Sequence, residues 1–236
     1  MGKDVIIACD FKNQSEVLSF LEKFGNKRPY LKIGMELYFA EGPSIVKTLK
    51  ARGHKIFLDL KLHDIPNTVE KAMAVLSSMQ IDMCNLHAAG TVPMMEAALR
   101  GLTRPDGKRP LLIAVTQLTS TNEERLHNEL LIGASMNETV LHYAALSKKA
   151  GLDGIVCSPL ESKSVHEKLG REFLTVTPGV RLKENDRGDQ ARVMTPSDAK
   201  KAGSDYIVVG RPITAAEDPL AAYEIFMKDF LDEAEN

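Results

Sequence analysis

Cysteine is scarce in this sequence, and the few that occur exclude two classes of small cross-linked protein. Cys9, Cys84 and Cys157 are odd in number and far apart, and no C-x-x-C pair is present. Neither a zinc ribbon nor a disulfide framework is therefore expected. Each cysteine lies in an apolar segment, which predicts a buried free thiol, and free thiols suit a reducing cytosol.

Long apolar runs are absent as well. No stretch of about 18 apolar residues occurs, so we expect no transmembrane helix. The first ten residues, MGKDVIIACD, contain too short an apolar run for a signal peptide, and Ile6 stands where a myristoylation signal has Ser or Thr. We therefore expect a soluble, cytoplasmic protein with no membrane partner.

Neither sign of charge dominates the sequence. The 30 basic and 32 acidic residues give a net charge of −2 at pH 7, and the basic residues form no run. No general attraction to nucleic acid or to an anionic membrane is expected from this balance. The sequence also lacks a P-loop, H-E-x-x-H, G-x-S-x-G and G-x-G-x-x-G, so nothing implies an organic cofactor.

Short β-branched runs alternate with longer amphipathic stretches along the chain. The apolar runs are nearly continuous, which is typical of parallel strands covered on both faces. Strands are predicted at 5–10, 30–34, 55–60, 82–87, 111–116, 154–158, 173–179 and 206–210. Helices are predicted near 14–24, 42–52, 67–79, 91–102, 135–150, 161–169, 196–202 and 219–231.

Eight strands that are each followed by a helix, in a chain of this length, match an α/β fold of the (β/α)₈ or TIM-barrel type. A doubly wound sheet usually has fewer strands in one domain. No linker rich in Pro, Gly or Ser interrupts the chain, so we expect residues 1–236 to form a single barrel domain. The active site of such a barrel lies at the carboxyl ends of the strands.

Acidic and basic side chains gather where the second and third predicted strands end. Asp59 and Lys61 are two residues apart, so on a regular strand they share a face and point into the mouth of the barrel. Lys32 and Asp64 lie in or near the same strand ends. A lysine flanked by carboxylates is held in its charged form, ready to stabilise negative charge and to donate a proton. A purely structural ion pair is the alternative, and the number of charges in one place favours catalysis.

Two histidines, His63 and His87, lie near these charges. Together with Asp59 and Asp64 they could ligate a divalent metal, but Lys61 would repel such an ion. A hydrogen bond to the backbone or to a neighbouring side chain is the better interpretation of both histidines. No metal site is therefore predicted.

An anion site is predicted on the other side of the mouth. Gly210 and Arg211 follow the eighth strand, where barrel enzymes often bind phosphate through backbone N–H groups. The Arg211 guanidinium would add a charge-assisted clamp, and Arg181 has a weaker claim to the same role. Residues 177–193 are long and polar, as expected of a mobile flap. From the residues alone, we expect a barrel enzyme acting on a small phosphorylated substrate.

The stretch FLDLKLHDIPNT, residues 57–68, resembles the D-x-K-x-x-D-I-x-x-T signature of orotidine 5′-phosphate decarboxylase. Further matching motifs occur in the family's order along essentially the whole chain. They are L-K-I-G-M-E at 31–36, H-A-A-G at 87–90, A-V-T-Q-L-T-S at 114–120, T-P-G-V-R at 177–181 and V-V-G-R-P-I-T at 208–214.

The resemblance implies a role for each matching position. Asp59 would lie against the substrate carboxylate, and Lys61 would protonate C6 of the pyrimidine as CO₂ leaves. Asp10 and Lys32 would hold ribose hydroxyls, with Lys32 also joining the charged array. Thr119 would contact the pyrimidine edge. The residues that would grip the 5′-phosphate are Pro178, Arg181, Gln190, Gly210 and Arg211.

The resemblance also implies an assembly and a reaction type. Asp64 and Thr68 would reach into the site of a neighbouring subunit, which makes the active unit a homodimer. The product would be uridine 5′-monophosphate, formed in pyrimidine biosynthesis without metal or cofactor. The alternatives are a metal-dependent aldolase or decarboxylase for phosphorylated sugars, since that group shares D-x-K-x-x-D, and a catalytically inactive nucleotide-binding barrel.

Overall fold

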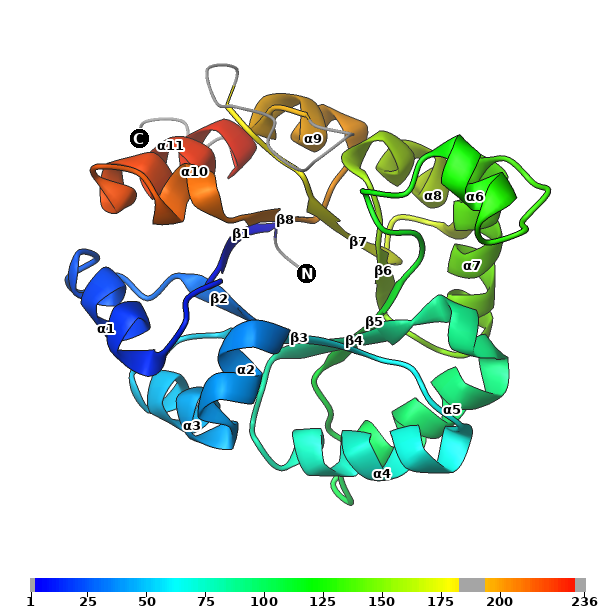
Figure 1. Ribbon diagram of the computed structural model, residues 1–236, viewed down its shortest axis with the longest axis horizontal. Coiled ribbons are helices and arrows are strands. Elements are labelled where there is room, and N and C mark those ends of the chain that lie inside the picture. The colour runs from blue at the N-terminus through cyan, green and yellow to red at the C-terminus, as the bar shows by residue number, and fades with distance from the viewer. Residues whose placement is uncertain (1–2, 183–193, 232–236) are drawn as a thin grey trace.

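The computed structural model describes residues 3–182 and 194–231. Within these ranges, parallel strands close into a barrel in sequence order (Figure 1). The strands are β1 (Asp4–Ala8), β2 (Tyr30–Gly34), β3 (Ile56–Leu62), β4 (Met83–His87), β5 (Leu111–Val115), β6 (Gly154–Val156), β7 (Leu174–Pro178) and β8 (Tyr206–Val209). The last strand pairs with the first, with Val208 opposite Ile6, so the sheet has no free edge. The predicted (β/α)₈ barrel is confirmed.

Helices surround the barrel and cover the outer faces of its strands (Figure 1). They are α1 (Gln14–Glu22), α2 (Met35–Glu41), α3 (Pro43–Ala51), α4 (Pro66–Ser77), α5 (Thr91–Leu102), α6 (Glu123–Asn128), α7 (Met136–Lys149), α8 (Ser162–Leu169), α9 (Pro196–Ala202), α10 (Arg211–Thr214) and α11 (Pro219–Leu231), with 3₁₀ turns η1 (Ala88–Gly90) and η2 (Pro159–Glu161). Across the described ranges, none of these helices has both the length and the apolar character that crossing a membrane requires.

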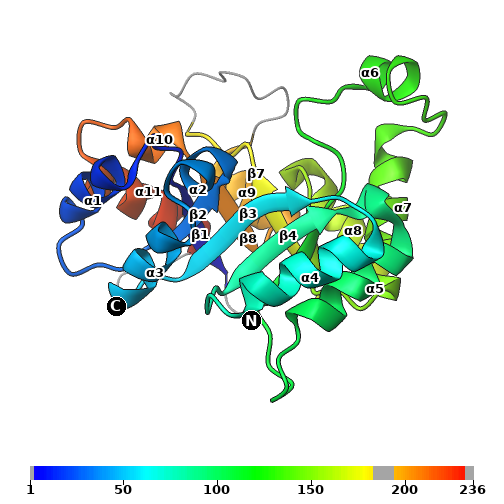
Figure 2. The same ribbon diagram turned by 60° about the horizontal axis from the view of Figure 1, so that its bottom comes forward.

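Every predicted strand and helix is present, with ends that differ by at most two residues. Three short helices, α2, α6 and α10, are not among the helices predicted above. Each buries a single side chain, Leu37 in α2, Leu126 in α6 and Ile213 in α10, so no apolar period appears in their sequences. The α6 helix stands out from the barrel on the polar segment between β5 and α7 (Figure 2).

Local signals in the sequence set the ends of several helices. The Asn13 side chain accepts a hydrogen bond from the Glu16 backbone N–H at the start of α1, and Ser135 forms a capping box with Glu138 at the start of α7. Gly203 ends α9 in the left-handed conformation, with φ of 95°. These local preferences agree with the tertiary fold, which explains the accuracy of the predicted boundaries.

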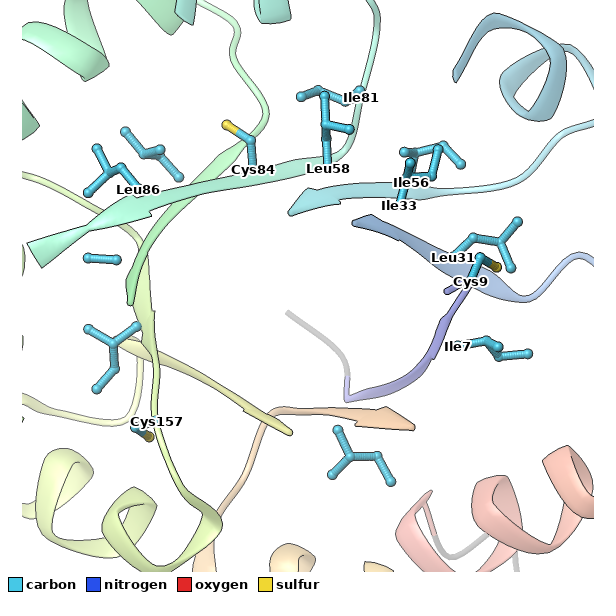
Figure 3. Close-up of a cluster of buried hydrophobic side chains, with 14 of the residues drawn as sticks. Ile7, Cys9, Leu31, Ile33, Ile56, Leu58, Ile81, Cys84, Leu86 and Cys157 are labelled. Carbon is cyan, nitrogen blue, oxygen red and sulfur yellow. The ribbon is translucent and has the colours of Figure 1, made fainter. Parts of the chain in front are cut away.

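The strands alternate between two buried environments. Ile6 of β1 faces the barrel interior, whereas Ile7 belongs to the larger core between the strands and the helices. Figure 3 shows side chains of this larger core pointing outward from the barrel, Cys9, Cys84 and Cys157 among them. All three cysteines are buried free thiols, as predicted. Burial raises the pKa of Cys9 and of Cys84 to about 12, so both stay protonated.

The close packing of α4 on α5 lies on the outer side of the barrel (Figure 1). It depends on Gly101 in α5, because a Cβ at this position would lie 2.0 Å from the carbonyl oxygen of Glu70 in α4. The Glu70 backbone could avoid this contact only if the two helices moved apart. The glycine therefore sets how closely the helices approach.

Replacing Gly101 with alanine should destabilise the protein, although alanine normally favours a helix over glycine by about 1 kcal/mol. Overpacking against the α4 backbone is expected to outweigh that gain and to lower the free energy of unfolding by about 1–3 kcal/mol. Chemical denaturation measures the change. Gly133→Ala is the control, because a Cβ at Gly133 meets no atom within 4 Å. Equal stability of Gly101→Ala and wild type would contradict the packing argument.

Candidate active site

The ends of the first three strands bring four charged side chains into one alternating row. The Lys32 Nζ atom lies 3.1 Å from Asp10 Oδ1 and 3.3 Å from Asp59 Oδ2. The other oxygen of Asp59, Oδ1, lies 2.7 Å from Lys61 Nζ. Three members of the predicted array, Lys32, Asp59 and Lys61, therefore meet within one chain, and Asp10 extends the row at its solvent-facing end.

Burial and ion pairing act in opposite directions on this row. Only 11% of the Lys32 and of the Asp59 side chain is exposed. Burial alone would lower the pKa of Lys32, but Asp59 and Asp10 outweigh it and the pKa is raised. Burial would raise the pKa of Asp59, but Lys32 and Lys61, with hydrogen bonds from Lys61 and Asn85, outweigh it and the pKa is lowered. Both groups are therefore charged at neutral pH.

The Lys61 side chain contacts Asp59 because of a backbone conformation that strand periodicity did not predict. The pairing of β3 with β4 shifts register between Leu58 and Leu62, and Lys61 has a φ of 52°. A non-glycine residue in this left-handed region costs about 1–3 kcal/mol. The predicted meeting of Asp59 and Lys61 in the mouth is confirmed, but a bulged backbone rather than a shared strand face produces it.

Asn85 is a site residue that the sequence reasoning did not select. It lies in β4, is 1% exposed, and faces the bulge of β3. Its side-chain nitrogen donates to Asp59 Oδ1 at 2.7 Å, and its side-chain oxygen accepts from the backbone N–H of Lys61 at 2.8 Å. The available signal was an amide inside the apolar run M-C-N-L-H, because a polar side chain buried in such a run needs partners.

Gly34 is a second residue that the sequence reasoning did not select. It ends β2, and a Cβ there would lie 3.1 Å from Lys32 Nζ and 3.3 Å from Asp10 Oδ1. The Lys32 ammonium could move away from such a methyl group only by lengthening an ion pair. The space at Gly34 therefore allows Lys32 to contact both carboxylates.

A cavity of about 320 Å³ opens beside the charged row, a volume suited to a small ligand. Apolar side chains, including Phe57 and Val208, form part of its wall. The predicted site residues that line it are Lys32, Asp59, Lys61, Thr119 and Pro178. The Lys61 ammonium, anchored by Asp59, is thus presented to a partly apolar space in which it can stabilise developing negative charge or donate a proton.

A larger hollow of about 880 Å³ lies at the opposite end of the barrel, among Tyr30, Tyr206 and Lys55. Several of its charged side chains pair with one another or with neighbours, as in Lys55 with Asp4 at 3.7 Å. In (β/α)₈ enzymes, chemistry takes place at the carboxyl ends of the strands, and the other end serves stability. The smaller cavity is therefore the candidate active site.

Asp64 and Thr68 do not join the row of charges. Asp64 lies in the turn after β3 and Thr68 in the first turn of α4, and both are exposed. Asp64 accepts a hydrogen bond from the Ile65 backbone N–H at 2.7 Å and forms no ion pair with any residue in the described ranges. The turn after the bulge carries Asp64 away, so one chain alone does not complete the predicted four-membered array.

The predicted phosphate-binding residues differ in their environment. Gly210 precedes α10 next to Asp10, and Arg211, the first residue of α10, is exposed. Arg181 is buried, and its guanidinium donates to the Val180 carbonyl oxygen at 3.0 Å. Gln190 and most of the predicted flap lie outside the described residues.

The two histidines lie beside each other. The ring centroids of His63 and His87 are 5.8 Å apart, and neither ring hydrogen-bonds to a residue that the structure describes. Burial, His63 and Lys61 together lower the pKa of His87, so its neutral form is favoured. Across residues 3–182 and 194–231, no group of three or more His, Cys, Asp or Glu side chains is arranged to hold a metal ion.

The fold and the site together define a (β/α)₈ barrel whose mouth presents a lysine, held by a buried carboxylate, to a small-ligand cavity. The model of the orotidine 5′-phosphate decarboxylase / HUMPS family matches residues 3–226, and this chain belongs to that family.

Individual relatives agree with this assignment. The chain is 54% identical to orotidine 5′-phosphate decarboxylase from Geobacillus sp. (strain WCH70), over 99% of both chains. It is 54% identical to the enzyme of the same name from Enterococcus faecalis (strain ATCC 700802 / V583), over 95% of this chain and 97% of that one. The crystal structure of orotidine 5′-phosphate decarboxylase from Lactobacillus acidophilus superposes with a TM-score of 0.87, at 43% identity over 97% of this chain and 99% of that one.

Gly34→Ala should lower the pKa of Lys32, because the new methyl group pushes the ammonium away from the carboxylates that raise it. NMR titration of ¹³C-labelled lysine side chains measures this pKa. A raised pKa contributes stability below the unfolded-state value, here 10.5, and that stability is lost as pH rises through the folded-state pKa. In the variant this loss should begin at lower pH. Gly133→Ala is the control, and an unchanged Lys32 titration in Gly34→Ala would contradict the steric argument.

Proposed function

We propose that this chain is an orotidine 5′-phosphate decarboxylase, which converts orotidine 5′-monophosphate into uridine 5′-monophosphate without metal or organic cofactor. The observation that carries the proposal is the Lys61 ammonium, 2.7 Å from the buried Asp59 carboxylate and facing the cavity at the barrel mouth. Family membership and the relatives of the same name support it. The three buried thiols support a cytoplasmic location.

The chemistry requires a positive charge beside C6 of the pyrimidine. When the bond between C6 and the carboxylate breaks, CO₂ leaves and the electron pair stays on C6, in the plane of the ring where the π-system cannot delocalise it. An ammonium group already fixed in a partly apolar cavity stabilises this charge and costs little reorganisation. Lys61 then transfers a proton from Nζ to C6, and the product is uridine 5′-monophosphate.

The other residues of the row would orient the substrate. Asp59 would lie against the substrate carboxylate, and Asp10 and Lys32 would bind the ribose hydroxyls. Thr119, which lines the cavity, would contact the pyrimidine edge. The residues predicted to bind the 5′-phosphate are Pro178, Arg181, Gln190, Gly210 and Arg211. Binding energy from this remote phosphate would help to organise the reacting end of the substrate.

The active unit in this proposal is a homodimer. Asp64 and Thr68 are exposed and lie on either side of Ile65, an apolar side chain that is 66% exposed. Burying Ile65 against a second subunit would remove apolar surface from water and would bring Asp64 and Thr68 against that subunit. Each site would then be completed by the partner.

The purified protein should convert orotidine 5′-monophosphate in the presence of EDTA, as measured by the ultraviolet spectrum of the pyrimidine. Lys61→Ala should reduce the rate by about 10²–10³-fold or more, because the charge at C6 loses its counter-ion. A strict requirement for added metal would favour a phosphosugar aldolase or decarboxylase. No spectral change despite nucleotide binding would identify an inactive barrel.

Mixing Lys61→Ala chains with Asp64→Ala chains should restore activity that neither variant has alone. Random association makes half of the dimers mixed, and each mixed dimer has one site with both residues, so about a quarter of wild-type activity is expected. Lys61→Ala mixed with Asp59→Ala is the matched control, because both residues belong to the same chain's site and no intact site can form. Recovery in neither mixture after co-refolding would contradict the shared site.

A further inference from the structure

The amide of Asn85 bonds to both members of the Asp59–Lys61 pair. It faces the part of β3 where register shifts, so the regular ladder between β3 and β4 is interrupted opposite it. The Asn85 side-chain oxygen accepts a hydrogen bond from the backbone N–H of Lys61 at 2.8 Å, in place of a backbone carbonyl of the ladder. Its side-chain nitrogen reaches the Asp59 carboxylate at 2.7 Å.

The orientation of this amide follows from its partners. The Lys61 backbone N–H is only a donor, so it requires the Asn85 oxygen. An ionised carboxylate only accepts, so Asp59 requires the Asn85 nitrogen. Aspartate, which has the same size, is only an acceptor when it is ionised, whereas the asparagine amide supplies one acceptor and one donor at any pH. Asparagine is therefore matched to both neighbours at once.

The hydrogen bond from the Asn85 nitrogen fixes the Asp59 carboxylate, on which the row of charges depends. Asp59 Oδ1 accepts from Lys61 Nζ and from Asn85 Nδ2, each at 2.7 Å, while Oδ2 lies 3.3 Å from Lys32. The two lysines have flexible side chains, whereas Asn85 is fully packed in the middle of a strand. Asn85 is thus the rigid donor that sets the plane of the carboxylate.

The hydrogen bond to the Asn85 oxygen holds the Lys61 backbone, which determines the direction of the Lys61 side chain. Lys61 adopts a φ of 52°, which a non-glycine residue keeps only when its surroundings enforce it. Without the Asn85 oxygen, the Lys61 N–H would lose its acceptor. The bulge would then lose the hydrogen bond that takes the place of regular pairing between β3 and β4. The Lys61 ammonium would then no longer be directed from this backbone into the cavity.

We propose that Asn85 is a positioning residue, which fixes the Asp59 carboxylate and the left-handed backbone of Lys61 together and so places the Lys61 ammonium for proton transfer. This inference rests on the decarboxylase function proposed above. Asn85 does not line the cavity, so its loss should reduce kcat while leaving substrate binding nearly unchanged.

Asn85→Asp separates positioning from packing. The substitution keeps the size of the side chain and leaves an oxygen to accept the Lys61 N–H. An ionised carboxylate at position 85, however, cannot donate to Asp59 and would repel it, whereas the protonated acid can donate. Because two adjacent carboxylates cannot both ionise easily, one of the pair should take up a proton well above the usual range for aspartate.

The variant should therefore show a distinctive pH profile. At pH 8 we expect kcat for orotidine 5′-monophosphate to fall about 10–100-fold, with KM and the Kd for uridine 5′-monophosphate within about threefold of wild type. As pH is lowered towards about 5, the ratio of variant to wild-type kcat should rise as the donor returns. Asn137→Asp, at an exposed position in α7, controls for the added charge and should follow wild type. A defect in Asn85→Asp that is constant with pH would overturn the positioning role.

A second measurement needs no substrate, so it remains informative if the protein proves not to decarboxylate the nucleotide. NMR titration of ¹³C-labelled aspartate carboxyl groups in Asn85→Asp should show two coupled titrations, one shifted above the usual aspartate range. In Asn137→Asp the added carboxyl should titrate independently of Asp59. Independent titration of the two groups in Asn85→Asp would show that residue 85 does not hold the Asp59 carboxylate, whatever the activity of the wild type.

Discussion

The candidate site depends on one buried carboxylate, that of Asp59, held between the ammonium groups of Lys32 and Lys61. Removing a charge from water is costly, and here the two ion pairs and the Asn85 hydrogen bond offset that cost, which is why the pKa of Asp59 is lowered in spite of its burial. Loss of one partner from a buried ion pair typically costs about 3–5 kcal/mol, because an unpaired charge is left behind. The side chains around Asp59 are therefore as constrained as the carboxylate itself.

The barrel supplies these constraints from three neighbouring strands. Lys32 comes from β2, Asp59 and Lys61 from β3, and Asn85 from β4, so hydrogen bonding between the strands fixes their spacing. Gly34 adds the space that lets the Lys32 ammonium contact Asp10 and Asp59 together. A group held by packed strands is positioned more accurately than one on a loop, which suits the proposed reaction, since that reaction relies on a preplaced charge.

The bulge in β3 separates two parts of one short segment that face in different directions. Before and within it, Asp59 and Lys61 face the cavity of their own chain. After it, the chain turns outward, and Asp64 and Thr68 become exposed at the start of α4. The proposed dimer needs both parts of the segment, because a single chain positions Lys61 but leaves Asp64 outside the row of charges. The tight contact of α4 with α5 at Gly101 keeps this outward segment in a defined position.

The sequence alone determined the barrel, because its nearly continuous apolar strands and amphipathic helices alternate in a pattern that few folds can bury. It also placed Asp10, Lys32, Asp59 and Lys61 at strand ends, and the resemblance to a known family supplied the roles predicted for them. Only the tertiary structure decided how they meet. Strand periodicity did not predict the left-handed Lys61, because the register shift arises from pairing with β4. It also missed Asn85 and Gly34, because their contacts join residues that are distant in sequence or involve the absence of a side chain.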